Sequence, residues 1–337
     1  MKLNRLDEIL SQAAGKRIVV IGDLMLDEFV WGKVGRISPE APVPVVQVTG
    51  ESFFPGGAAN VARNLREFVD RTAVIGVVGK DRSGRQLRTL LNEQNIDTAA
   101  IVEDPDLQTI VKTRVIAGHQ QVVRVDREQV RAPTAEQVAN VTSAFGKIVS
   151  DIDALIFEDY GKGFLGSELV RQISAQAQAA GKIVAADPNP NHPLDWRNTT
   201  VVKPNRAEAF LAAGLPCTDS SDHPEKDDAL MKVGAILLGK WDTKSLLVTL
   251  GEQGMMLFQK NEAPHHIPTK AQQVFDVSGA GDTAIALFTL ALCCGASPIE
   301  AAEIANHASA VVVGKLGTAT VTKQELRASF QNDASVA

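Results

Sequence analysis

Residues 276–283 read Asp-Val-Ser-Gly-Ala-Gly-Asp-Thr and open directly into the apolar run 284–294. A turn of small residues at a helix start leaves backbone N–H groups unpaired, and the helix dipole places partial positive charge there. The stretch therefore predicts an anion site. Asp282 lies in the first turn, where a carboxylate can take a proton from a hydroxyl beside a bound phosphate, which favours phosphoryl transfer. The alternative is that the glycines only allow close helix packing and that Asp282 only complements the dipole.

Outside this stretch, short apolar runs alternate with amphipathic helical segments. Near-continuous apolar runs are typical of strands buried on both faces of a sheet. The predicted strands are 18–21, 73–78, 154–157, 183–186, 200–202 and 246–249. Helices between them share capping-box spacing at Thr134 with Gln137, Ser297 with Glu300, and Thr322 with Glu325. The sequence predicts an α/β fold with a doubly wound, mainly parallel central sheet and helices on both faces.

Two segments, 31–49 and 109–127, break this alternation. The first contains three prolines, and the second alternates polar and apolar residues, which is typical of extended, edge-type strands. They predict a small β-sheet that projects from the core as a lid over a ligand. Two ordinary hairpins packed on the core are the alternative. We expect both segments to be insertions within a single domain that covers residues 1–337.

Composition limits the class of protein. Of 337 residues, 45% are hydrophobic and 22% are charged, which is enough apolar material for a large core. A net charge of −6 argues against a nucleic-acid binder, which needs a basic face. The three cysteines are too few and too badly spaced for a disulfide framework or a zinc site. No secretory signal or membrane-spanning run is found, so we expect a cytoplasmic protein.

Polar and small residues follow the first predicted strand. Asp23 comes directly after it, and ligands of doubly wound sheets bind beyond the carboxyl ends of strands, so its carboxylate is a candidate partner of substrate hydroxyls. Gly56 and Gly57 allow the backbone to touch a ligand, and the Asn60 amide can donate to and accept from a sugar hydroxyl. The structural alternatives are a turn residue at Asp23 and a local cap at Asn60.

Two later turns carry further candidates. Asn205 and Glu208 enter a helix after a predicted strand, so Glu208 is a candidate magnesium ligand and Asn205 a candidate phosphate or ribose contact. An N-cap with its partner three residues later explains the same pair without a ligand. Thr249, Gly251 and Gly254 end another strand, where they form either backbone contacts to a nucleotide or a hairpin turn.

The order of these motifs resembles that of the ribokinase-like (PfkB) carbohydrate kinases over nearly the whole chain. The resemblance implies ATP-dependent, magnesium-assisted phosphoryl transfer to a sugar hydroxyl, with the β-sheet as a lid. It implies a general base at Asp282 and an anion hole formed by the N–H groups of Gly279, Ala280 and Gly281. A monovalent cation such as potassium near the Asp276 turn is common in the family.

The same resemblance assigns binding roles to the other motifs. The implied sugar contacts are Asp23, Gly56, Gly57 and Asn60. The implied magnesium and phosphate contacts are Asn205 and Glu208. The implied nucleotide contacts are Thr249, Gly251, Gly254 and Asn306.

Segments 22–27, 36–46, 159–163 and 311–318 are similar to the kinase halves of bifunctional ADP-heptose synthases. That similarity implies phosphorylation of the anomeric hydroxyl of D-glycero-D-manno-heptose 7-phosphate to the 1,7-bisphosphate, on the way to lipopolysaccharide core heptose. Because the chain ends soon after Phe330, we expect no nucleotidyltransferase domain and a partner activity on another chain. The family resemblance also implies a homodimer formed through the lid.

One departure concerns the sugar phosphate. The heptose kinases usually have a lysine after Asp-Pro where this chain has Asn189. We hypothesise that the phosphate is instead bound by a basic residue among Lys203, Lys112, Arg114 and Arg124. The rival functions are a kinase for another sugar or sugar phosphate, such as fructose 6-phosphate or a pentose, and a non-catalytic sugar or nucleotide sensor.

Overall fold

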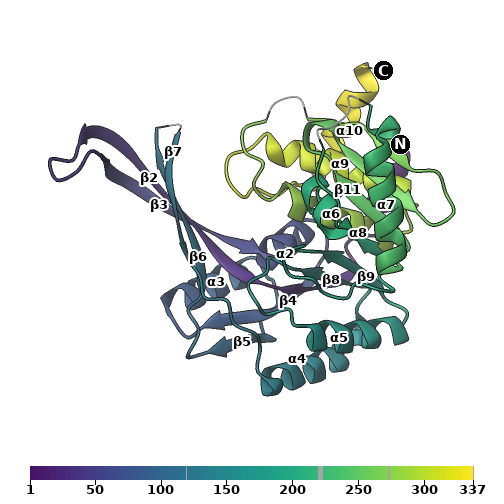
Figure 1. Ribbon diagram of the computed structural model, residues 1–337, viewed down its shortest axis with the longest axis horizontal. Helices are drawn as coiled ribbons and strands as arrows, with labels where there is room; N and C mark the ends of the chain where they lie inside the picture. The colour runs from purple at the N-terminus through teal and green to yellow at the C-terminus, as the bar shows by residue number, and fades with distance from the viewer. Residues whose placement is uncertain (119, 219–222, 272–273, 337) are drawn as a thin grey trace.

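The central sheet dominates the computed structural model, which describes residues 1–118, 120–218, 223–271 and 274–336. The strand order is β13-β12-β11-β10-β9-β8-β1-β4-β5 (Figure 1). Strands from β5 to β11 run parallel to their neighbours, whereas β12 and β13 are antiparallel additions at one edge. The strands are β1 (Arg17–Gly22), β4 (Arg71–Gly79), β5 (Ile101–Asp104), β8 (Ala154–Glu158), β9 (Ile183–Asp187), β10 (Val201–Val202), β11 (Ser245–Thr249), β12 (Met255–Gln259) and β13 (His265–Ile267).

Helices cover both faces of this sheet, which confirms the predicted doubly wound class. Side chains alternate between faces along a strand, so in β1 Ile18 and Val20 enter one hydrophobic core while Val19 and Ile21 enter the other. The first core is covered by α1 (Leu3–Ser11), α2 (Ala58–Arg66), α3 (Arg82–Glu93), α8 (Ala280–Cys293), α9 (Pro298–Val313) and α10 (Lys323–Val336). The second is covered by α4 (Ala135–Ile148), α5 (Ser167–Ala179), α6 (Arg206–Ala213) and α7 (Asp228–Trp241).

A second, smaller sheet has the order β3-β2-β6-β7 and extends away from the body of the molecule, toward the left of Figure 1. Its strands are β2 (Leu24–Ile37), β3 (Pro44–Gly57), β6 (Ile110–Ala117) and β7 (Gln120–Arg127). β2 is parallel to β6 and antiparallel to β3, and β6 is antiparallel to β7. His119, within the predicted segment 109–127, lies outside the described residues.

Strands β2 and β3 are longer than segment 31–49, which was predicted as the first part of the lid. β2 begins at Leu24, directly after β1, and β3 continues to Gly57. The physical reason is burial, because Leu24 and Leu26 pack into the first core while the distal half of β2 is exposed. The small sheet is therefore anchored in the core at one end and open to solvent at the other.

The carboxyl edge of the central sheet positions the polar residues described below. In register, Gly22 of β1 pairs with Glu158 of β8, which pairs with Asp187 of β9. The first turn of α8 lies over this edge, beginning after Gly279 in the left-handed conformation with φ of 79°. Within the described residues, no helix is both long enough and apolar enough to cross a membrane.

Candidate functional site

Asp282 is a buried carboxylate in the first turn of α8, held by a donor at each oxygen. Asn60 Nδ2 of α2 donates to Oδ2 at 2.7 Å, and the Tyr160 hydroxyl donates to Oδ1 at 2.8 Å. Burial raises the pKa of Asp282, and the two donors together with Lys203 oppose that rise. A carboxylate fixed in this way, with an increased proton affinity, is suited to accept a proton from a hydroxyl.

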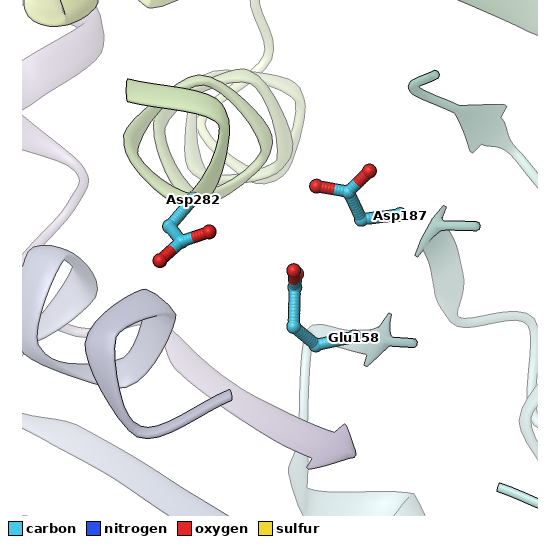
Figure 2. A group of neighbouring side chains, drawn as sticks. All are labelled: Glu158, Asp187 and Asp282. Carbon is cyan, nitrogen blue, oxygen red and sulfur yellow. The ribbon is translucent and has the colours of Figure 1, made fainter. Parts of the chain in front are cut away.

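Two further carboxylates converge on Asp282 (Figure 2). Glu158 and Asp187, at the ends of β8 and β9, point toward it, and one oxygen of each of the three lies within 4.8 Å of the others. Burial raises the pKa of both Glu158 and Asp187, and their mutual repulsion raises that of Glu158 further. Lys203 Nζ lies 2.7 Å from Asp187 Oδ2 and partly compensates this charge.

Lys203 is itself buried. Burial alone lowers the pKa of its ammonium group, but the carboxylates of Asp187 and Glu158 more than offset this, so its pKa is raised. A Cβ atom added at Gly281 would lie only 3.1 Å from the Lys203 ammonium. The lysine therefore lies against the turn that was predicted to bind an anion, and it supplies positive charge there.

One observation indicates that the cluster of Glu158, Asp187 and Asp282 could hold a divalent cation. Glu158 Oε2 is buried and has no hydrogen-bond partner in the described part of the chain, and a buried carboxylate oxygen is costly to leave unpaired. Carboxylate oxygens are the ligands that Mg²⁺ prefers. Glu208, the predicted ligand, instead has Oε2 accepting from the Asn205 N–H at 2.8 Å. Glu158 and Asp187 are thus the residues placed to hold a cation, with Glu208 at the same cavity.

Two cavities meet at the start of α8. One, of about 480 Å³, is polar, and its lining includes Glu158, Asp187, Lys203 and Asp282. The other, of about 460 Å³, is lined largely by apolar residues of α9 and the loop before α8. Both share a wall formed by Thr249, Gly251, Val277 and Gly281. A ligand could therefore place a charged group in the polar cavity and a flat apolar group in the other cavity, with its connecting atoms next to Gly281.

The predicted nucleotide residues gather around these cavities. Asn205 and Glu208 line the polar one, and Gly254 and Asn306 line the other. The Asn205 side chain also accepts from the Glu208 N–H at 2.9 Å, so the capping box exists as well as the cavity contact. The Asn306 amide donates to the Pro268 carbonyl at 2.7 Å, which fixes the apolar cavity against the loop before α8.

The residues of the predicted anion turn do not all line the polar cavity. Gly279 and Gly281 line the polar cavity, whereas the Ala280 N–H lies 3.3 Å from the Val277 carbonyl and donates to it. Asp276 holds the turn because its carboxylate accepts from the N–H groups of Ser278 at 2.9 Å and of Gly317 at 3.1 Å.

Asp23 is engaged by backbone groups. Its carboxylate accepts from the N–H groups of Tyr160 at 3.0 Å, Lys162 at 2.9 Å and Phe164 at 3.2 Å. Burial raises the pKa of Asp23 to about 6, against the effect of these donors. Three donors occupy most of the accepting capacity of one carboxylate, so Asp23 anchors the loop after β8.

Asp27, four residues further on, is a second buried carboxylate of this segment. It pairs with Arg114 of β6, and its charge acts on Asp282. A Cβ at Gly56 would lie 2.2 Å from Asp27 Oδ2, so only glycine fits there, whereas Gly57 is the N-cap of α2 with φ of 59°. Asn60 is oriented by Arg63, whose Nη1 donates to Asn60 Oδ1 at 3.3 Å.

The other basic candidates lie in different surroundings. Lys112 pairs with Asp126 at 3.0 Å and with Glu128 at 3.7 Å, on the same face of the small sheet as Arg114. Arg124 pairs with Asp126, but its side chain is 51% exposed. Arg114 also lies over the Phe29 ring, 5.3 Å from its centroid. Of these three residues, Arg114 is the one that pairs with Asp27.

Five residues of the site either were not predicted as site residues or have a different position from the one that their predicted role implies. They are Asp27, Glu158, Tyr160, Asp187 and Lys203. A usable signal existed for two of them, because an acidic residue ends each of two neighbouring parallel strands. Strand alternation would have placed Asp27 on the opposite face from the core residues Leu24 and Leu26.

A doubly wound sheet with a fixed, buried carboxylate in a polar cavity that adjoins an apolar one has the architecture of a phosphotransferase that acts on an alcohol group. Comparison with known families agrees. The profile of the pfkB family carbohydrate kinases matches residues 16–325, and the chain therefore belongs to this ATP-using family.

Curated relatives share much of the sequence. The chain is 43% identical over 314 residues to "Bifunctional protein HldE" of Caulobacter sp. (strain K31), which covers 93% of this chain and 62% of that protein. It is 42% identical over 323 residues to the protein of the same name from Magnetococcus marinus, covering 95% and 65%. The chain thus spans less than two thirds of the length of these relatives.

Solved structures share the fold at low sequence identity. Phosphofructokinase-2 from Escherichia coli, in complex with potassium, has a TM-score of 0.76 at 20% identity, with 95% of this chain and 99% of that chain covered. Ribokinase from Arabidopsis thaliana, complexed with ribose and ATP, has a TM-score of 0.70 at 18% identity, with 94% and 99% covered. These likenesses confirm the ribokinase-like fold.

Proposed function

We propose that this chain transfers the γ-phosphoryl group of ATP to the anomeric hydroxyl of D-glycero-D-manno-heptose 7-phosphate and forms the 1,7-bisphosphate. The observation that carries the reaction type is the Asp282 carboxylate, which two donors fix in the wall of the polar cavity. The choice of sugar is supported by the segments that resemble heptose kinases and by the identity to the HldE relatives.

In this proposal Asp282 removes the proton from the sugar hydroxyl as the hydroxyl oxygen attacks the γ-phosphorus of ATP. One O–P bond forms to the sugar, the bond to the β-phosphate oxygen breaks, and ADP leaves. The N–H groups of Gly279 and Gly281 and the ammonium of Lys203 stabilise the negative charge on the transferring phosphoryl group. The apolar cavity with Asn306 binds the adenine, and Thr249, Gly251 and Gly254 contact the rest of the nucleotide.

Glu158 and Asp187 would hold magnesium, with Asn205 and Glu208 at the phosphates. Magnesium supplies neutralisation of phosphate charge and alignment of the transferred group. We expect Mg²⁺ without nucleotide to raise the melting temperature of the protein, because an ion that binds only the folded state stabilises it. Glu158→Gln should lose that increase. An equal increase in the variant would contradict the assignment.

A potassium ion near the Asp276 turn is part of the proposal by family resemblance.

The sugar phosphate would lie between the core and the small sheet. Asp27 and Asn60 are proposed to bind its hydroxyls, near Gly56 and Gly57, while Asp23 holds the neighbouring loop. Arg114 is the preferred partner of the 7-phosphate, with Lys112 beside it. We further propose that residues 1–337 act as one kinase unit, that the small sheet is its lid, and that two copies pair through that sheet.

The direct test measures ADP release with ATP and Mg²⁺ against heptose 7-phosphate, the free heptose, fructose 6-phosphate and ribose. The proposal expects the highest kcat/KM for heptose 7-phosphate, with the product phosphate on the anomeric carbon by ³¹P and ¹³C NMR. Asp282→Asn is the inactive reference. Sugar-independent binding of ATP without ADP release would favour a sensor and overturn the proposal.

A kinase for another sugar phosphate is the second candidate, and Asn189 favours it. This residue lines the polar cavity where the heptose kinases resembled here usually have lysine. Asn189→Lys distinguishes the two, because it should increase kcat/KM for heptose 7-phosphate only if that sugar phosphate reaches this wall. A preference for fructose 6-phosphate in both forms would support the second candidate.

A further inference from the structure

Tyr160 is the only tyrosine of the chain, and it lies on the loop directly after β8. Its hydroxyl donates to Asp282 Oδ1 at 2.8 Å, within the wall of the polar cavity. At neutral pH a phenol is protonated and therefore a constant donor. The contact joins a loop at the sheet edge to a helix 122 positions further along the chain.

The loop that carries Tyr160 is held independently of the Asp282 contact. Asp23 accepts from the backbone N–H groups of Tyr160, Lys162 and Phe164, on both sides of the turn. Gly161 within it has φ of 66°, and its N–H donates to Asp159 Oδ1 at 2.8 Å. Because the backbone is held at four points, the position of the loop does not depend on Asp282.

Each carboxylate oxygen of Asp282 therefore accepts a hydrogen bond from a different side chain. Asn60 of α2 fixes Oδ2, and Tyr160 fixes Oδ1, so the carboxylate plane cannot rotate about its Cβ–Cγ bond without breaking one bond. A general base needs a defined lone-pair direction toward the hydroxyl that it deprotonates, since small misplacements cost large factors in rate.

We propose that Tyr160 is a positioning residue for phosphoryl transfer, which orients the Asp282 carboxylate toward the acceptor hydroxyl, with Asp23 as the anchor of its loop. This inference rests on the proposed role of Asp282 as the base. It adds a residue that acts on the base through one hydrogen bond, whereas the sugar and nucleotide contacts act on the substrates.

The test compares Tyr160→Phe with Thr289→Val. Thr289 also carries a buried hydroxyl, on α8 itself, and that hydroxyl has no hydrogen-bond partner among the described residues. Tyr160→Phe should lower kcat by about tenfold or more while KM for ATP stays within about twofold, since only the orientation of the base is lost. Thr289→Val should keep the wild-type kcat. A wild-type kcat in Tyr160→Phe would overturn the inference.

An NMR experiment distinguishes a positioning role of Tyr160 from a packing role, and it does not depend on measuring enzyme activity. Incorporation of ¹³Cζ-tyrosine gives one resonance, because the chain has one tyrosine. If the phenol donates to the charged Asp282, that resonance should shift in Asp282→Asn and not in Thr289→Val. An unchanged resonance in Asp282→Asn would overturn the inference, even if Tyr160→Phe failed to fold. An inactive wild type with a shifted resonance would instead refute the proposed function alone.

Discussion

The Asp282 region and the small sheet both contain paired charges, but they place them in opposite environments. Around Asp282, the charges of Glu158, Asp187 and Lys203 are buried and depend on one another. On the small sheet, Arg124 pairs with Asp126 in the open. Removing one partner of a buried set costs about 3–5 kcal/mol, whereas an exposed pair contributes about 0–1 kcal/mol. The buried charges should therefore matter more to the stability of the folded chain than the exposed ones.

The small sheet is itself graded along its length. At its base, Asp27 is buried and pairs with the partly buried Arg114, and at its tip the strands are exposed. Its base consequently resembles the core site more than it resembles its own tip. Substitutions along this gradient test whether burial, and not membership of either sheet, determines which charges matter.

The largest effect is expected at Asp282. Asp282→Asn should lower turnover by a factor on the order of hundreds or more, because the proton acceptor is lost, while ATP binding is kept. Single-turnover kinetics and a nucleotide titration measure the two separately. Asp195→Asn is the matched control, since Asp195 is exposed and pairs with Arg197 at the surface. Near-normal turnover in Asp282→Asn would refute the role of the base.

The second prediction concerns how the stability of the fold changes with pH, which should have opposite signs for Asp23 and for Asp126 of the small sheet. Burial raises the pKa of Asp23 to about 6, so between about pH 4 and that value the folded chain holds a proton that the unfolded chain has released. The contribution of Asp23 to stability is therefore highest at low pH and falls as pH rises, by about 3 kcal/mol. Urea unfolding of wild type and Asp23→Asn at a series of pH values should show their difference decreasing over this range.

Asp126 on the small sheet should show the opposite sign. Partial burial raises its pKa, but Lys112 and Arg124 outweigh this and lower it below the ordinary value. Its contribution to stability is present above the unfolded pKa and is lost as pH falls through the folded one. The difference between wild type and Asp126→Asn should increase with pH. Parallel trends in the two variants would break the comparison.

A third, smaller effect concerns the gradient within the small sheet. Arg114→Met should raise KM for the sugar phosphate by about tenfold, because a partly buried cation beside Asp27 is lost. Arg124→Met should change KM by less than about twofold, because the Arg124 side chain is 51% exposed. Steady-state kinetics on both variants, with melting temperatures as the control for folding, decide the point. Equal KM changes would place the phosphate elsewhere.

The smallest effect is expected on the exposed valines of β7. Val123 and Val125 are 47% and 43% exposed on the face opposite Arg124. Val123→Thr with Val125→Thr should change the stability of one chain by no more than about 0.5 kcal/mol. If two copies pair through this face, the same change should weaken the dimer in sedimentation equilibrium. Unchanged self-association would exclude this face.

Much of the fold followed from local pattern. The apolar runs predicted the central strands because burial on both faces leaves few polar positions, as in β8 and β11. The Asp276 turn was recognisable because its small residues and its helix are contiguous in sequence. The base of β2 was harder to predict, since Leu24 and Leu26 are buried by contacts with distant elements.

The site was less predictable because its charges meet only in space. Glu158 and Asp187 come from separate strands, and neither has a local motif around it. Asp23 and Asp27 look equivalent in sequence, but in the structure Asp23 accepts from backbone donors of the loop after β8, whereas Asp27 pairs with Arg114. Lys203 was considered for the sugar phosphate, but its pairing with Asp187 places it beside Gly281.

The double use of Asn205 and Glu208 has an evolutionary consequence. The two side chains start α6 and also line the polar cavity, so selection for a stable helix and selection for ligand contact act on the same positions. A descendant that lost phosphoryl transfer would still be under pressure to keep both residues. Drift should therefore appear first at Glu158 and Lys203, whose burial of charge is unfavourable once the chemistry no longer requires it.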